Sequence, residues 1–139
     1  MPSDAEIRDI LMTARTVALV GWSPGADRPS HRVAAFLAAR GYRVIPVNPG
    51  QAGKAALGGT VVATLAEAVA QAGRIDLVDI FRRSEAAGEV VDAAIAAGTG
   101  AVWMQLGVVD EAAAARARAA GLRVVMDRCP AIEIPRLGL

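Results

Sequence analysis

A regular alternation of short apolar runs with helical patterns constrains this chain most. The runs are rich in Val and Ile and mostly continuous, which is typical of strands covered on both faces. They lie at residues 16–20, 43–47, 75–81, 101–105 and 123–127, and a sixth short strand at 60–63 is left open. Strands separated by helices pair in parallel through right-handed crossovers. The sequence therefore predicts an α/β fold with a doubly wound, mainly parallel sheet of five to six strands.

Helix boundaries in the sequence support this interpretation. Capping boxes at residues 3–6 and 64–67 predict two helix starts. Further helices are expected to begin at Ser30 and near Ser84 and Asp110. Four of the helical patterns end at a glycine, which takes the left-handed conformation at little cost; these are Gly41, Gly73, Gly98 and Gly121.

The strand order follows from the crossovers. We expect residues 16–20 at the centre, with 43–47 on one side and the three later strands on the other. The order then reverses beside the first strand. Ligands of such sheets bind in the crevice at this switch point, outside the carboxyl ends of the strands. The loops that follow the strands are therefore the candidate site.

Composition narrows the class of protein. With 139 residues, the chain has room for one domain, predicted to span 1–139, and too few residues for two ordinary ones. No apolar run approaches the ~20 residues that cross a bilayer, and the first ten residues carry charges where a signal peptide is apolar. We therefore expect a cytoplasmic protein with no membrane partner. The net charge of +1 gives no electrostatic case for nucleic acid. One cysteine and one histidine argue against a disulfide and against a Cys- or His-based metal site.

The loop after the first strand has the character of a phosphate-binding loop. It leads into a helix N-terminus, where free N–H groups favour an anion. Gly21 permits close approach of a ligand, Ser23 or Ser30 offers a hydroxyl, and Arg28 offers a charge. The glycines at 21 and 25 do not have the G-x-G-x-x-G spacing of dinucleotide sites. The alternative is purely structural, with Ser30 as an N-cap and the glycines as turn formers.

The end of the second strand lacks the acid that usually holds the ribose of NAD. Asn48 and Pro49 stand there, with Lys54 beyond, and this suits a ligand that carries a phosphate on its ribose. The alternative is a simple Asn-Pro-Gly turn.

Two further strand ends offer candidate contacts. Phe81 could lie against a base or an apolar arm, and Arg82 and Arg83 could meet phosphates or pair with acids such as Glu85. Asp76 and Asp79, on or next to a strand, are either buried bases or partners of a helix end or an arginine.

Cys129 is expected at the end of the last strand. It either forms a mixed disulfide with a ligand thiol, in which case Arg128 would lower the pKa of the exposed cysteine, or it packs as an inert buried thiol. No nucleophile–base pair can be assembled from the strand ends, so we expect no catalysis.

Five motifs together carry a family resemblance. In chain order they are "VALVGWSPGADRPSHRV", "GYRVIPVNP", "VDIFRRSE", "VWMQLGV" and "VVMDRCPAIE". In this order the chain resembles the small stand-alone CoA-binding proteins of bacteria and archaea. Those proteins are similar to the CoA-binding domain that begins the alpha subunit of succinyl-CoA synthetase. The resemblance runs from about Ile7 to Leu137.

The resemblance implies a Rossmann-like domain that binds coenzyme A or acyl-CoA as a non-catalytic carrier, sensor or regulator. Gly21, Ser23, Pro24, Arg28, Pro29 and Ser30 would form the diphosphate loop. The remaining contacts would be Asn48 and Pro49 with Lys54 near the adenosine, Phe81, Arg82 and Arg83 opposite, and Gln105, Gly107, Arg128 and Cys129 along the crevice. The alternatives are an NAD(P)-binding oxidoreductase-type domain and a protein-interaction module without a ligand. The sequence names no protein partner and leaves self-association open.

Overall fold

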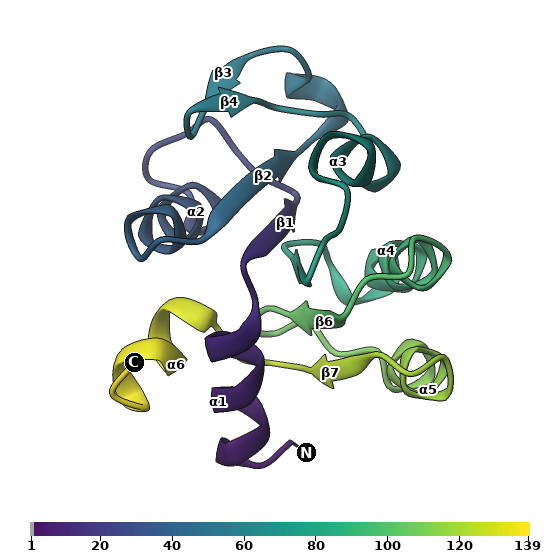
Figure 1. Ribbon diagram of the computed structural model, residues 1–139. Helices are drawn as coiled ribbons and strands as arrows, with labels where there is room; N and C mark the ends of the chain where they lie inside the picture. The colour runs from purple at the N-terminus through teal and green to yellow at the C-terminus, as the bar shows by residue number, and fades with distance from the viewer. Residues whose placement is uncertain (1) are drawn as a thin grey trace.

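Five parallel strands form the central sheet of the computed structural model, which describes residues 2–139 (Figure 1). Their order is β2-β1-β5-β6-β7, as predicted from the crossovers. The strands are β1 (Thr16–Val20), β2 (Arg43–Val47), β5 (Leu77–Ile80), β6 (Ala101–Met104) and β7 (Arg123–Val125). β1 is central, with Val20 opposite Val47 of β2 and Ile80 of β5. The chain reverses its direction of winding beside β1, so the switch point lies where predicted.

The sixth strand left open at residues 60–63 does not join this sheet as a strand. Thr60 belongs to a small antiparallel hairpin of β3 (Ala55–Ala56) and β4 (Gly59–Thr60). Val62 makes only a single bridge to Val47. The hairpin turns through Leu57 and Gly58, both with positive φ, which breaks the segment before a longer strand can form.

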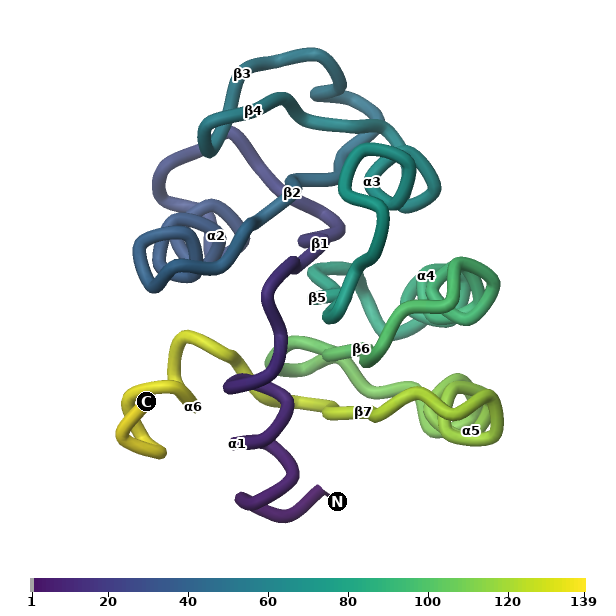
Figure 2. The backbone as a smooth tube through the Cα atoms, viewed as in Figure 1, coloured from purple at the N-terminus to yellow at the C-terminus, as the bar shows by residue number. Residues whose placement is uncertain are grey.

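Helices cover both faces of the sheet, as Figures 1 and 2 show. One layer is formed by α3 (Leu65–Ala72), α4 (Ser84–Ala96) and α5 (Glu111–Ala119), and the other by α1 (Asp4–Thr13), α2 (Pro29–Ala39) and α6 (Pro130–Arg136). Alternate strand residues supply the two cores. Val78 and Ile80 pack against the first layer, whereas Leu19, Leu77 and Trp103 pack against the second. Two apolar faces explain why the strands are continuous apolar runs.

The helix starts fall into two groups. Ser3, Thr64 and Asp110 cap α1, α3 and α5, each accepting a backbone N–H bond of 3.0–3.2 Å. In contrast, the residues before α2 and α4, Arg28 and Arg83, make no capping side-chain bond. The structural alternative required Ser30 to be an N-cap, but the N-cap position of α2 is Arg28. Proline at position 29 begins the helix one residue earlier, which places Ser30 in the first turn, buried.

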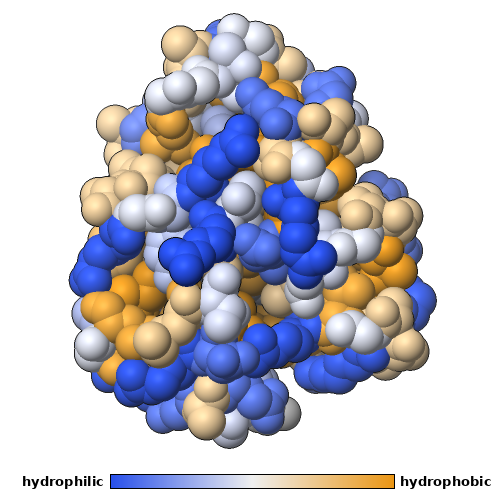
Figure 3. Space-filling view, viewed as in Figure 1, coloured by the Kyte–Doolittle hydropathy of each residue, from blue (hydrophilic) through white to orange (hydrophobic). Residues whose placement is uncertain are grey.

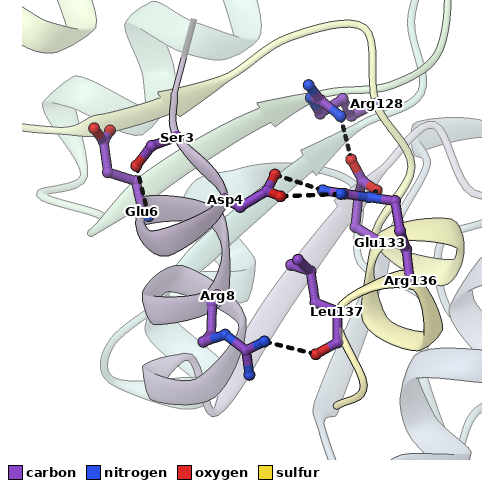
Figure 4. A network of polar contacts seen from close by, with 8 residues as sticks. All are labelled: Ser3, Asp4, Glu6, Arg8, Arg128, Glu133, Arg136 and Leu137. Atoms are coloured by element: carbon purple, nitrogen blue, oxygen red, sulfur yellow. Dashed lines mark hydrogen bonds and ion pairs between the residues drawn. The ribbon is translucent and has the colours of Figure 1, made fainter.

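A network of charges joins the first and last helices (Figure 4). The buried carboxylate of Glu133 accepts bonds of 2.5 Å from Arg128 and 2.6 Å from Arg136. Arg136 also donates two bonds to Asp4, and Arg8 donates to the carbonyl of Leu137. These contacts fix α1 and α6 side by side on one face of the sheet.

Figure 3 shows hydrophobic areas interrupted by hydrophilic groups on the face in view. None of the helices in residues 2–139 combines the length and the apolar composition needed to cross a bilayer.

Candidate functional site

The backbone that follows β1 passes close to the backbone that follows β5 at Gly21. Its φ is +94°, and a Cβ atom there would lie 2.3 Å from the carbonyl oxygen of Phe81. Its N–H donates to the carbonyl of Val47, so the end of β2 is joined to the same point. Glycine is therefore required at the centre of the switch point.

The loop after β1 is braced by its neighbours. Asn48 donates a 2.7 Å bond to the carbonyl of Trp22 and accepts one from Gly50. The ring of Trp22 packs on His31, with centroids 5.6 Å apart, and His31 Nδ1 lies 3.0 Å from the carbonyl of Ser23. The loop is thus held in one conformation by the protein itself, which lowers the entropic cost of binding a ligand.

One cavity opens beside Gly21 on the α3–α4 face of the sheet, with a volume of about 400 Å³. The ends of β1, β2 and β5 supply part of its wall, and the helices supply the rest. Its lining residues are Val20, Gly21, Val47, Asn48, Pro49, Ala63, Thr64, Leu65, Phe81, Arg82, Glu89, Val90 and Ala93. We call this the α4 cavity.

A second cavity opens on the α2–α6 face, with a volume of about 510 Å³. Its lining residues are Gly21, Arg28, Pro29, Ser30, Arg32, Val33, Phe81, Gln105, Leu106, Val108, Cys129 and Ile132. We call this the α6 cavity. Gly21 and Phe81 belong to both linings. The two cavities therefore meet at the switch point, one on each side of the sheet.

Each of the two linings includes arginine, and the α4 lining also includes the carboxylate of Glu89. Arg82 lines the α4 cavity, and Arg28 lines the α6 cavity. Two helices, α2 and α4, start at this junction. Neither Arg28 nor Arg83, the residues before them, makes a capping side-chain bond. Free backbone N–H groups at a helix start and neighbouring guanidinium groups both favour an anion.

Several predicted site residues lie outside both linings. Ser23 and Pro24 belong to the loop after β1, and Lys54 is exposed next to the β3–β4 hairpin. The backbone N–H of Gly107 donates a 2.7 Å bond to the carboxylate of Asp127. Arg83 is exposed, and its Nε lies 3.4 Å from a carboxylate oxygen of Glu85. The structure therefore favours the ion pair that the sequence left as the alternative for Arg83.

Of the two alternatives for Cys129, the structure supports the buried thiol, and Arg128 does not lower its pKa as expected for an exposed thiol. Arg128 is turned toward Glu133 and bonds to its carboxylate. Burial raises the pKa of the Cys129 thiol, outweighing hydrogen bonds from the backbone of Ala131 and Ile132. Cys129 does line the α6 cavity as predicted, with 6% of its surface exposed. Its thiol is therefore protonated at neutral pH.

Asp79 is a buried carboxylic acid on the sheet and does not pair with a helix end or an arginine, the two partners that the sequence offered as the alternative. It lies on β5 between Leu19 and Trp103, with no exposed surface. Gln105 donates a 2.7 Å bond to one of its carboxyl oxygens, and the other has no partner. Burial raises the pKa of Asp79 to about 7, despite the bond from Gln105. Asp76 behaves differently, because Arg15 and Thr16 donate backbone bonds to it.

Sequence reasoning missed the contributions of the helices and of some apolar residues inside the motifs. Thr64 was identified only as part of a capping box and Val90 was not among the predicted site residues, yet both line the α4 cavity. Leu106 and Ile132 line the α6 cavity and were not predicted. A helical residue reaches the strand ends only through the crossover geometry, so no local signal in the sequence identifies it.

The fold and the site define the class of Rossmann-like α/β domains, with a doubly wound sheet and a crevice at the switch point. The sequence model of the CoA binding domain family matches residues 15–135. The chain belongs to this family. It is 39% identical over 128 residues to the uncharacterized protein YneT of Bacillus subtilis (strain 168), covering 92% of this chain and 91% of that protein.

Solved structures agree on the fold. A Thermus thermophilus protein is 33% identical, with a TM-score of 0.87 over 98% of this chain and 99% of that one. A hypothetical protein from Pyrococcus horikoshii OT3 is 34% identical, with a TM-score of 0.88 over 98% of this chain and 92% of that one. A dinucleotide forming acetyl-coenzyme A synthetase from Ca. Korarchaeum cryptofilum is 19% identical. It has a TM-score of 0.68 over 81% of this chain and 25% of that one, and this likeness concerns the fold alone.

Proposed function

We propose that this protein binds coenzyme A across the switch point. The observation that carries the proposal is that two cavities share Gly21 and Phe81 and lie on opposite faces of the sheet. CoA has a nucleotide at one end, an extended pantetheine arm at the other, and a diphosphate between them. A ligand of this form matches two cavities that meet at the switch point and are each lined in part by arginine.

Each part of CoA then has a matching part of the site. The α4 cavity, with Asn48, Pro49 and Arg82, takes the adenosine end. The diphosphate lies over Gly21 and the start of α2, within reach of Arg28. The pantetheine arm enters the α6 cavity and ends near Gln105 and Cys129.

We further propose that binding is not followed by chemistry. Cys129 is the strongest nucleophile in the two linings, and burial raises the pKa of its thiol. Asp79 has no exposed surface from which to act as a base on a ligand. A carrier, sensor or regulator of CoA therefore fits this site better than an enzyme. Incubation with acyl-CoA thioesters followed by thiol detection should give no turnover above the uncatalysed rate, and sustained release of CoA would contradict the proposal.

Calorimetric titration of the purified protein with CoA, NAD, NADP and FMN tests the binding proposal. We expect heat with CoA and none with the other three. Tight binding of NAD without binding of CoA would instead favour an oxidoreductase-type domain. A protein-interaction module would bind none of the four.

Arg28→Ala makes the titration specific to the site. Loss of a charge-assisted bond to phosphate should weaken CoA binding by about 1–3 kcal/mol. Arg118→Ala is the matched control, because Arg118 is exposed on α5 and lines neither of the two cavities. Equal affinities of the two variants would remove Arg28 from the site. The affinity of the unchanged protein should also fall as salt is added.

A further inference from the structure

Two bulky apolar side chains stand exposed at the mouth of the α6 cavity. Leu106, just after β6, is 57% exposed, and Ile132 in α6 is 52% exposed. Both line this cavity, although they come from different elements. Covering them would remove apolar surface from water, which is favourable.

The wall of the α6 cavity divides into a polar and an apolar part. The start of α2 supplies Arg28 and Ser30, which suit the diphosphate. The connection after β6 and the helix α6 supply an apolar part made of Leu106, Val108 and Ile132, to which Val33 and Phe81 add. The lining contains no Asp or Glu. A pantetheine arm alone, with two amide groups and a thiol, does not use this apolar part fully.

We propose that the α6 cavity holds the apolar acyl group of an acyl-CoA, so that the physiological ligand is a thioester rather than free CoA. This proposal rests on the proposed function and adds the ligand class. The acyl chain extends from the thioester between Leu106 and Ile132 and covers both. Arg28 and Arg32 remain with the phosphates at the start of α2 and do not meet the acyl group.

A series of thioesters tests the ligand class by calorimetry. Each methylene buried should raise the affinity about fourfold, so butyryl-CoA should bind about 15-fold more tightly than acetyl-CoA. Succinyl-CoA is the matched control for butyryl-CoA, because it replaces the terminal methyl group with a carboxylate. Its affinity should fall to that of free CoA or below, since the apolar part of the wall would have to desolvate a charge.

Three outcomes are informative in different ways. Equal affinities for CoA, acetyl-CoA and butyryl-CoA would overturn the acyl proposal and leave CoA binding intact. Preference for succinyl-CoA would overturn it as well and would assign Arg28 or Arg32 to a carboxylate. Absence of binding by CoA and all thioesters would overturn the proposed function itself.

Variants at the mouth locate the acyl group. Leu106→Ser with Ile132→Ser should abolish the preference for butyryl-CoA over CoA, so that the ratio of the two affinities falls to about one. Both side chains are half exposed, so the substitutions should leave the fold intact, and the single alanine variants provide a milder check. Met12→Ser is the control, because Met12 is equally exposed but lies on α1 outside this cavity. An equal loss of CoA and butyryl-CoA affinity in the double variant would contradict the proposed place of the acyl group.

Discussion

Gly21 is the residue on which the geometry of the site depends most. Its positive φ alone should cost alanine about 1–2 kcal/mol. The carbonyl of Phe81, 2.3 Å from the added Cβ, should cost a further 1–3 kcal/mol or so. We therefore predict that Gly21→Ala lowers the free energy of unfolding by roughly 2–5 kcal/mol, measured by urea denaturation.

Gly41 provides the matched control for this prediction. Its φ is +97°, and nothing lies within 4 Å of an added Cβ. Gly41→Ala should therefore show only the conformational cost. If both variants lost the same stability, the close approach of β1 and β5 would carry no energetic weight.

Asp79 predicts an unusual pH dependence of stability. Its pKa is about 7 in the folded protein and close to the ordinary value of 3.8 in the unfolded chain. Between these values the folded state binds more protons, so the free energy of unfolding falls as the pH rises. The resulting loss in the free energy of unfolding is about 4 kcal/mol, and it is complete above pH 7. Asp79→Asn should remove this dependence and be more stable than the unchanged protein at about pH 8.

Asp76→Asn is the contrasting variant for a urea titration at several pH values. Burial raises the pKa of Asp76, but backbone bonds from Thr16 and Arg15 and a side-chain bond from Arg74 outweigh it, so the net pKa is lowered. The stability that Asp76 contributes is present above pH 3.8 and is lost on acidification. Its variant should therefore be less stable at neutral pH, with the opposite sign to Asp79→Asn. Two variants that change stability in the same direction would refute the raised pKa of Asp79.

Among the elements, α1 and α6 are joined most clearly by charge. Glu133→Gln removes one carboxylate from between Arg128 and Arg136 (Figure 4). Breaking a fully buried pair costs about 3–5 kcal/mol, and the partly exposed arginines reduce this to about 2 kcal/mol here. The loss should be visible by thermal unfolding at pH 7.

The pH profile separates this contribution from simple packing. Burial raises the pKa of Glu133, but Arg136 and Arg128 outweigh it, so the net pKa is lowered. Its stabilisation is present above pH 4.5 and disappears as the pH falls. Glu85→Gln, at an exposed pair, should change stability by less than about 1 kcal/mol. A loss in Glu133→Gln that persisted in acid would point to packing rather than charge.

The same elements show what sequence could and could not predict. Continuous apolar runs and terminal glycines predicted the strands, their order and the switch point, because these depend on local pattern and on crossover handedness. The start of α2 was placed one residue late, since Ser30 looked like a cap while Pro29 takes the first helical position. Arg128 was predicted to line the crevice, but it pairs with the buried carboxylate of Glu133. That carboxylate belongs to a network that reaches Asp4 of α1 through Arg136, and no local pattern encodes a contact between the two ends of the chain.

At the scale of the whole molecule, the two helical layers have one site in common. The sheet separates the layers, and Gly21 and Phe81 at its carboxyl end are the residues shared by the cavities on its two faces. A long ligand that crosses this point would contact α3 and α4 on one side and α2 and α6 on the other. The central claim is therefore one of location as much as of affinity.

A crystal structure of the protein with CoA tests that claim most directly. We predict the adenosine in the α4 cavity beside Asn48 and Pro49, the diphosphate over Gly21 and the start of α2, and the pantetheine arm in the α6 cavity. A CoA molecule bound on one face only, or away from Gly21 and Phe81, would contradict it.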